Sequence, residues 1–506
     1  MYSYNPLSEF YEIGDFMKFV LGIDFGGGAS KTTLLGEDGV IYAEATYEYP
    51  TLYPKSGWTE QNPDDWYEAT KANIKSVLDK SKINPSDIVA VSLDAATHTA
   101  VLMDEDFKVL RPSIYWTDTR SVGEANYLKD KMGDFILEKA LHKVDTIWTL
   151  PQLLWVKNNE PDIWKKTKRI VFAKDYVRHQ LTGDYVTDVI EAEGSMFFDY
   201  GKMDYSDELL SELGIEKDSL PKLCNPSDVI GEVTKKAAAE TGLAEGTKVL
   251  CGTTDTVMEV FASGAVSKGE MTIKLATAGR ICVVTDKPYP DKNLINYSHV
   301  IDGLWYPGTA TKSCAASYRW YRDTFSEDYA VLDAGAEKIA PGAEGLMFHP
   351  YLNGELTPYA DPSLCGSFVG VRAGHTKAHF TRAVLEGVSM SILDCMNALS
   401  KIGMEHKNEA VIIGGGGKSP LWRQITSDML GLKLVKKKYS DSSFGSAMLA
   451  GVTAGLWDSA KDAVVACNET VLETLPDMNN NAIYAEQFKK YKAVHDALAP
   501  IYHGEY

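Results

Sequence analysis

Two segments that each follow an apolar run carry glycine and aspartate, the residue types that phosphate chemistry uses. The first reads Asp24-Phe25-Gly26-Gly27-Gly28-Ala29-Ser30-Lys31. Consecutive glycines let a backbone approach a ligand closely, and successive N–H groups can cradle phosphate. Asp24 could hold Mg²⁺ directly or through water, because Mg²⁺ takes few carboxylates and keeps several waters. A tight hairpin with a solvated aspartate is the competing interpretation, and spacing alone does not separate the two.

The second segment, Gly252-Thr253-Thr254-Asp255-Thr256, follows an expected strand at 248–251. Thr253 or Thr254 would cap the next helix and place Asp255 in its first turn. The helix dipole favours an ionised carboxylate there, which is the form that a general base needs. An aspartate at a helix start is also common without any chemical role, and on this segment alone that interpretation is preferred.

A third segment, residues 410–420, ends an apolar run in four glycines and continues with Lys418, Ser419 and Pro420. It is not a phosphate-binding P-loop, because Ile412 stands where that motif needs its first glycine. We expect a strand, then a helix capped by Ser419 with Pro420 at its first position. A bare surface at Gly415 and Gly416 could lie against a flat ring such as adenine; unusual backbone angles are the alternative reason for the glycines.

The histidines give weaker signals. His98 follows an expected strand at 88–93, and a lone histidine is usually structural. His375 and His379 would share one face of a helix, but Thr376 stands where a zinc protease has its glutamate. No Cys/His cluster supports a metal site either.

The elements that would position these residues alternate between strands and helices, which is an α/β pattern. A second block, with strands at 271–275 and 280–285 around Ala276-Thr277-Ala278-Gly279, repeats the form of the first and suggests two related halves. We place an N-terminal extension at 1–16, a first domain at 17–262 and a second at 263–506, joined by a hinge near 260–268. Further expected strands are 19–24, 31–36, 40–47 and 410–413; expected helices are 66–80, 147–158, 172–182, 311–324, 376–402 and 445–454. Asn62 or Pro63 would start the first of these helices.

The bulk composition narrows the class of protein. The 506 residues include 70 acidic and 51 basic ones, giving a net charge of -19, which disfavours nucleic acid and anionic membranes as partners. Seven scattered cysteines without a CxxC pair indicate reduced thiols in a cytosolic, cytoplasmic protein. No apolar run reaches membrane-spanning length, and the acidic first 16 residues do not resemble a signal peptide. A homodimer stays open as the assembly.

Taken together and in this order, several motifs resemble the FGGY family of carbohydrate kinases, most closely its xylulokinase-like branch. The resemblance runs from about Lys18 to Tyr491. It is carried by residues 21–26, 58–63, 110–112 with 116–120, 173–176 with 181–183, 349–355, 382–387 and 414–424.

The resemblance implies two actin-like, ribonuclease H-like domains around a central cleft, with the sugar mainly on the first and ATP mainly on the second. It implies that Asp255 is the catalytic base and that Asp24 supports Mg²⁺–ATP. It identifies His98 as a sugar-pocket histidine, with Thr97, Asp255 and Thr256 also at the substrate. The residues that it places at ATP are Gly26, Gly27, Gly28, Ser30, Lys31, Thr277, Gly279, Gly415, Gly416 and Gln424.

The chain departs from the family pattern in three places. Gly27 and Gly28 replace the usual Thr or Ser of the first loop, and the second loop reads Ala276-Thr277-Ala278-Gly279. In the sugar pocket Ala96-Thr97 replaces Gln-Met, and Thr256 replaces Asn. We therefore expect ATP-dependent phosphorylation of a primary hydroxyl of a small sugar, such as the ketopentose xylulose. Ribulose, gluconate or erythritol stay open as acceptors, and a sugar- and nucleotide-binding regulator with little turnover is the alternative of another class.

Overall fold

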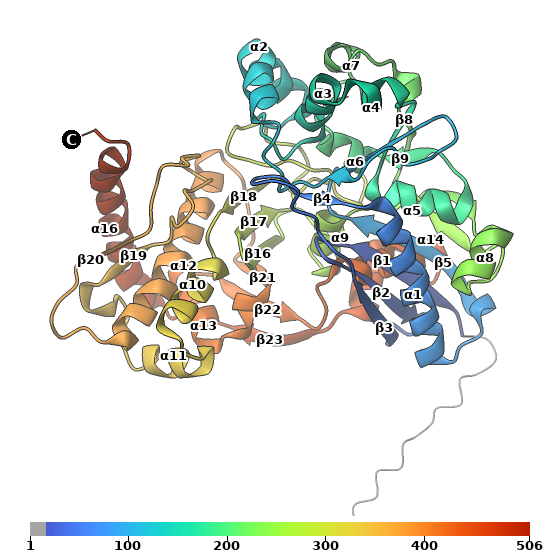
Figure 1. The fold of residues 1–506 in the computed structure, drawn as a ribbon. Helices are drawn as coiled ribbons and strands as arrows, with labels where there is room; N and C mark the ends of the chain where they lie inside the picture. The colour runs from blue at the N-terminus through green and yellow to red at the C-terminus, as the bar shows by residue number, and fades with distance from the viewer. Residues whose placement is uncertain (1–16, 506) are drawn as a thin grey trace, which may run out of the picture.

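The computed structural model of the protein describes residues 17–505, so the predicted extension at 1–16 lies outside the described residues. Two mixed sheets with helices on their faces form the molecule, which confirms the α/β prediction (Figure 1). Over residues 17–505, every helix is too short or too polar to cross a bilayer.

The first sheet has seven strands and lies at the blue end of the chain in Figure 1. The strand β1 (Phe19–Phe25) has an antiparallel neighbour on one side, β2 (Ala29–Gly36), and a parallel neighbour on the other, β5 (Ile88–Ala95). In spatial order the strands are β13 (Val229–Glu232), β14 (Lys248–Leu250), β5 (Ile88–Ala95), β1 (Phe19–Phe25), β2 (Ala29–Gly36) and β3 (Ile41–Glu48), with β15 (Thr253–Thr254) continuing β14 along β5.

The second sheet has six strands in the order β18 (Gly308–Thr311), β17 (Gly279–Val283), β16 (Met271–Leu275), β21 (Glu409–Ile413), β22 (Lys433–Lys437) and β23 (Thr470–Thr474). Three antiparallel strands, two parallel ones and an antiparallel edge strand follow one another, as they do in the first sheet. The two sheets thus share one topology, which confirms the predicted relation between the halves.

Helices cover both faces of the first sheet. One face is covered by α1 (Pro63–Ser81), α5 (Ala173–Thr182) and α8 (Lys235–Thr241). The other face is covered by α9 (Asp255–Ala262), α14 (Ser442–Thr453) and α15 (Ala460–Cys467). The helix α14 comes so close to β1 that a Cβ on Gly22 would lie 1.9 Å from the Ser443 carbonyl oxygen.

This packing bears on the predicted boundary at residue 262. Every strand of the first sheet precedes that residue and every strand of the second follows it. Yet α14 and α15, which come late in the sequence, cover the first sheet together with α9. The boundary itself stays a prediction, because the chain passes between the two sheets after α9, before α14 and again after α15.

The remaining helices build the core around the second sheet and a helical layer above the first. The former are α10 (Ala315–Phe325), α11 (Tyr329–Ala336), α12 (Lys377–Lys401), α13 (Pro420–Leu430) and α16 (Met478–Tyr502); the latter are α2 (Val122–Ala140), α3 (Thr149–Asn159), α4 (Pro161–Lys166), α6 (Val189–Gly194) and α7 (Asp207–Leu213) (Figure 1). Two-stranded pairs connect them: β4 (Glu60–Gln61) with β7 (Ser113–Ile114), β6 (Ala100–Met103) with β8 (Arg169–Phe172), β9 (Val186–Asp188) with β12 (Lys222–Cys224), β10 (Phe198–Asp199) with β11 (Asp204–Tyr205), and β19 (Met347–His349) with β20 (Ser367–Val369).

Helix starts follow the capping signals in the sequence. Asn62 caps α1 with Pro63 in its first turn, and Ser419 caps α13 by accepting from the Trp422 amide. One boundary was predicted wrongly: the helix expected from residue 311 begins at Ala315, because residues 308–311 pair with β17 as an edge strand.

Candidate active site

The carboxyl ends of three neighbouring parallel strands bring the first set of predicted residues together. Asp24 on β1 lies opposite Asp94 on β5, and Asp94 lies opposite Thr253 on β15. Ligands of open α/β sheets bind outside this edge, because the strand ends leave a crevice there. Asp255 begins α9 one residue beyond β15 and so lies at the same edge.

A kink at Gly252 sets the position of Asp255. Gly252 has a φ of 71°, and a Cβ there would lie 2.0 Å from the Leu93 carbonyl oxygen. Only glycine accepts both the left-handed backbone and this close approach. The kink lets residues 253–254 resume pairing with β5, and α9 starts directly afterwards.

Hydrogen bonds orient the Asp255 carboxylate through one of its oxygens. Oδ1 accepts from the Thr256 amide at 2.6 Å and from the hydroxyls of Thr256 and Thr97, each at 3.2 Å. Among the described residues no hydrogen bond reaches Oδ2, so this oxygen can accept a proton from a ligand. Burial raises the pKa of Asp255, while the charge of Lys274 lowers it.

Asp24 and Asp94 form a carboxyl pair that sequence reasoning did not foresee. Burial raises the pKa of both groups, and the hydrogen bond between them stabilises the ionised form of Asp24 and the protonated form of Asp94. Asp94 also accepts from Ser446 of α14 at 2.5 Å. The pair therefore resists carrying two negative charges, and Asp24, with a pKa raised to about 7, is its more readily ionised member.

The predicted sugar-pocket histidine, His98, is buried beside aromatic rings. Its ring centroid lies 4.8 Å from that of Trp148, and Nδ1 has no partner among the described residues. Burial lowers the pKa of His98 to about 3, so the ring is neutral at physiological pH. A neutral imidazole with an unused nitrogen can exchange hydrogen bonds with a hydroxyl group.

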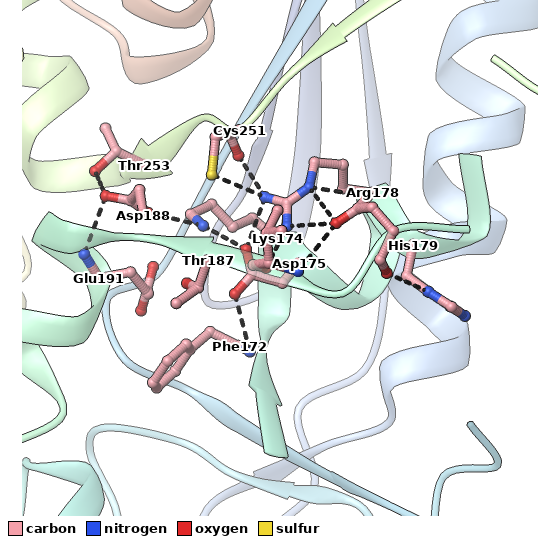
Figure 2. A network of polar contacts seen from close by, with 12 residues as sticks. Phe172, Lys174, Asp175, Arg178, His179, Thr187, Asp188, Glu191, Cys251 and Thr253 are labelled. Atoms are coloured by element: carbon pink, nitrogen blue, oxygen red, sulfur yellow. Dashed lines mark hydrogen bonds and ion pairs between the residues drawn. The ribbon is translucent and has the colours of Figure 1, made fainter. Parts of the chain in front are cut away.

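A buried polar network, drawn in Figure 2, holds the backbone on both sides of this site. Asp188 accepts from the Thr253 hydroxyl at 2.7 Å and lies 2.8 Å from the Lys174 ammonium. Arg178 donates to the Cys251 carbonyl oxygen at 2.6 Å, one residue before the kink. Glu191 accepts from the His98 amide, fixing a residue whose φ is 50°.

This network also corrects the predicted helix cap. Thr254 is the N-cap residue of α9 by its backbone, but its side chain makes no capping bond. The Thr253 hydroxyl is used by Asp188 instead. Both threonines therefore hold the segment before Asp255 in the sheet rather than capping the helix.

The first glycine loop turns its carbonyl groups inward. Those of Gly26, Gly27 and Gly28 accept from Tyr49 or from Thr51 and Gln61. Gly27 and Gly28 are exposed, and their amides have no partner among the described residues. This arrangement leaves two N–H groups for a phosphate.

Ser30 and Lys31 differ from the glycines of that loop. The Ser30 hydroxyl is fully buried in the sheet, so the geometry gives no support to a phosphate contact. The Lys31 ammonium lies 2.6 Å from Glu44 and 3.2 Å from Asp441. Lys31 lines a cavity of about 420 Å³ between the two halves, together with Gly414 and Gly417.

The second loop, residues 276–279, repeats this arrangement. The carbonyls of Ala276 and Thr277 accept from the amides of Ala315 and Cys314 at the start of α10. Thr277 and Ala278 are exposed. Gly279 serves packing, because a Cβ there would lie 2.6 Å from Thr311 Cγ2.

The third loop borders the larger cavity. About 700 Å³ lie between the glycine loop and α10, α11 and α13, and Gly415, Gly416, Tyr318, Tyr329 and Leu421 are among the lining residues. The mainly apolar wall and the bare Gly415 suit a flat heteroaromatic ring. Gln424 is not at this cavity: its amide donates to Asp428 and to the Leu475 carbonyl oxygen.

Charged residues inside apolar strands were the signal that sequence reasoning missed. Asp94 directly follows the strand predicted at 88–93 and lies next to the end of β5, and parallel strand ends meet at one edge. Lys274 and Arg280 interrupt β16 and β17 and lie opposite each other. Lys274 is ion-paired with Glu259 at 2.6 Å, one turn after Asp255 on α9.

Protein-family models match nearly all of this architecture. Residues 19–262 match the N-terminal domain of the FGGY family of carbohydrate kinases, and residues 249–454 match its C-terminal domain. The xylulose kinase of Bacillus subtilis is 33% identical over 493 residues, covering 96% of this chain and 97% of that protein. The gluconokinase of the same organism is 30% identical over 457 residues, covering 87% of this chain and 88% of that protein.

Solved structures agree in fold. A xyloylose kinase from Brucella ovis superposes with a TM-score of 0.89 at 29% identity, covering 96% of this chain and 100% of that chain. A gluconate kinase from Lactobacillus acidophilus superposes with a TM-score of 0.90 at 25% identity, covering 96% and 99% of the respective chains.

Proposed function

This chain belongs to the FGGY family of carbohydrate kinases, and we propose that it transfers the γ-phosphoryl group of ATP to a primary hydroxyl of a small sugar, with Asp255 as general base. The observation that carries the proposal is the asymmetric bonding of Asp255. Three donors hold Oδ1, and Oδ2 faces no partner among the described residues. A general base needs this combination of fixed orientation and one free oxygen.

Residues of both halves fit Mg²⁺–ATP. Asp24 and the neighbouring Asp94, whose Oδ1 is buried without a partner among the described residues, offer the few carboxylate oxygens that Mg²⁺ takes. The exposed amides of Gly27 and Gly28, and those of Thr277 and Ala278, could hold phosphate oxygens. When bound, Mg²⁺ neutralises charge on the phosphates. The cavity beside Gly415 and Gly416 would take the adenine ring.

The protein's part in the reaction follows from this placement. Asp255 removes the hydroxyl proton at Oδ2 as the hydroxyl oxygen attacks the γ-phosphorus. Thr97 and Thr256 keep the carboxylate aimed, and the neutral His98 orients the acceptor. Lys274 lowers the pKa of Asp255 against the effect of burial, which favours the ionised form that a base needs.

Two acceptor sugars are favoured by the names of the relatives. Relatives named xylulose kinase favour a ketopentose such as xylulose, and relatives named gluconokinase favour gluconate. The decisive assay couples ADP release to a visible signal with Mg²⁺–ATP and a panel of ketoses, aldoses, polyols and sugar acids. We expect acceptor-dependent ADP release. Its absence across the panel would contradict the proposal and favour a binding regulator.

A further inference from the structure

The strand β17 separates two cores, and Arg280 points away from the core of its own half. Ile281 and Val283 belong to the core around the second sheet. Gly279 lies on the same face of the strand and packs against Thr311. Cys282 and Val284 instead belong to the core that contains Trp148, Tyr297 and Tyr306. Side chains alternate along a strand, so Arg280 lies on the face turned toward the first half.

On that face Arg280 meets a row of rings that leads to His98. The guanidinium carbon lies 5.7 Å from the Tyr306 ring centre, and Tyr306 and Tyr297 are stacked at 5.8 Å. His142 is 5.5 Å from Tyr297 and is stacked on Trp148 at 4.2 Å. Trp148 in turn contacts His98. The row therefore starts at the predicted sugar-pocket histidine and ends at Arg280.

Titration behaviour agrees with this placement. Burial raises the pKa of the Tyr297 hydroxyl, the positive charge of Arg280 lowers it, and the carboxylates of Glu191 and Asp255 raise it. Burial and the charge of Arg280 lower the pKa of His142 to about 3. Tyr297 is thus near enough to Arg280, Glu191 and Asp255 for their charges to affect its pKa, and the ring of His142 is neutral.

Several polar atoms of this row are buried without partners among the described residues. They are Nδ1 of His98, both ring nitrogens of His142, the Tyr306 hydroxyl, and Nε and Nη2 of Arg280. Buried polar groups in proteins nearly always have hydrogen-bond partners, so a cluster of unpaired ones indicates a place where a ligand supplies them.

The charge of Arg280 specifies the ligand further. A guanidinium stays protonated in proteins, and Arg280 is only partly exposed, so a lasting lack of a partner for its charge is costly. Across residues 17–505 no carboxylate lies within ion-pair distance of Arg280. Glu259, the nearest acidic influence on it, is already paired with Lys274 at 2.6 Å. The missing partner is an anion, and the planar fork of arginine matches a carboxylate.

We propose that Arg280 is a specificity-determining residue of the acceptor pocket and binds the carboxylate of a sugar acid whose primary hydroxyl, at the other end of the molecule, lies at Asp255. This inference rests on the proposed function and decides between its two acceptors in favour of the acid. His98 and His142 would bond the hydroxyls along the chain. A neutral ketose leaves the guanidinium uncompensated.

The test compares two acceptors that differ only in the group at issue. Gluconate and glucitol share their hydroxyl configuration, and a carboxylate in one replaces a hydroxymethyl group in the other. Xylulose serves as the neutral ketose. We expect kcat/KM of the unaltered enzyme to favour gluconate over glucitol by a factor on the order of 100.

The variant Arg280→Gln should remove this preference. We expect the KM for gluconate to rise on the order of 100-fold, while kcat/KM for glucitol and the KM for ATP change by less than about threefold. Arg280→Lys should recover part of the preference, because it keeps the charge but not the planar fork. Arg372→Gln, a change at an exposed arginine of the same half, is the matched control and should leave the ratio unchanged.

Two results would overturn the inference. One is a preference for xylulose or glucitol over gluconate that Arg280→Gln leaves as it was. The other is an equal loss for every acceptor with a raised KM for ATP, which would assign Arg280 to the phosphates.

Thermal unfolding of the unaltered protein without ATP tests binding separately from turnover. Gluconate should raise the Tm more than glucitol at equal concentration. If no acceptor stimulated ADP release, the proposed function would fail, while this binding comparison would still decide on Arg280. Equal Tm shifts with gluconate and glucitol would contradict the inference. This comparison needs only the unaltered protein, so it holds even if the Arg280 variants do not fold.

Discussion

The two halves share a strand order but carry different side chains at equivalent positions, and Asp24 in one corresponds to Lys274 in the other. In the first sheet the hairpin mouth pairs Asp24 with Lys31, and β5 adds Asp94 beside Asp24. In the second sheet the same positions hold Lys274, Arg280 and Ile413. One half thus presents a carboxylate pair to the crevice, and the other presents cations facing it.

The loops beyond these positions are alike in how they treat the backbone. Residues 26–28 and 276–278 both turn carbonyl groups toward the protein and leave exposed amides. A duplicated fold therefore provides two phosphate-facing loops, whereas the side chains next to them divide the chemistry. The acidic half suits proton transfer and Mg²⁺, and the basic half suits recognition of anions.

The first prediction tests the acidic half at its base. Asp255→Asn keeps the size and the bonds to Oδ1 but cannot take a proton, so kcat should fall by about 10²–10⁴. Steady-state kinetics should show KM values for acceptor and ATP within a few-fold of the unaltered enzyme. Asp302→Asn, at an exposed position, is the control. A variant close to full activity would exclude Asp255 as the base.

The second prediction concerns the carboxylate pair. Asp24→Asn should raise the Mg²⁺ concentration needed for half-maximal rate by roughly 10–100-fold, because Asp24 is the more readily ionised carboxyl of the pair. Titration of Mg²⁺ at fixed ATP measures this. An unchanged Mg²⁺ requirement would show that Asp24 has no part in holding the metal.

The third prediction links the halves through pH. The pKa of Asp255 is raised by burial, and a base works only when ionised, so activity should fall by roughly tenfold per pH unit below a pKa above the usual aspartate value. Lys274→Met removes the charge that lowers this pKa and should move the acid limb to higher pH. The exposed Lys268→Met is the control. An acid limb at the same pH in the Lys274→Met variant would show that Lys274 does not affect the pKa of Asp255.

The fourth prediction, with the smallest effect, uses two adjacent glycines. A Cβ on Gly415 meets nothing within 4 Å, whereas a Cβ on Gly416 would lie 2.8 Å from both Leu275 and Trp422. Gly415→Ala should raise the KM for ATP roughly three- to tenfold without changing the Tm. Gly416→Ala should lower stability by about 1–3 kcal/mol. An unchanged KM in the Gly415 variant would place the adenine elsewhere.

Local sequence signals predicted most of the fold. Asn62-Pro63 and Ser419-Pro420 marked helix starts that the structure confirms, because capping depends on neighbouring residues alone. The helix expected at 311 failed because residues 308–311 were taken up by an edge strand, which depends on a distant hairpin. The candidate site was predicted in part: Thr97 does reach Asp255, while Gln424 bonds to Asp428.

The sequence by itself determined the strand ends, the glycine loops and the aspartates that follow them, since these depend on short-range patterns of residue type. Tertiary structure decided which of these residues meet. Asp94 became the partner of Asp24 through strand pairing across about 70 residues of chain, and Ser446 joined them from a helix of the other half. The surroundings of Arg280 were decided in the same way, because the face of β17 that it occupies packs on Tyr306, which is joined through Tyr297 to rings from the first half.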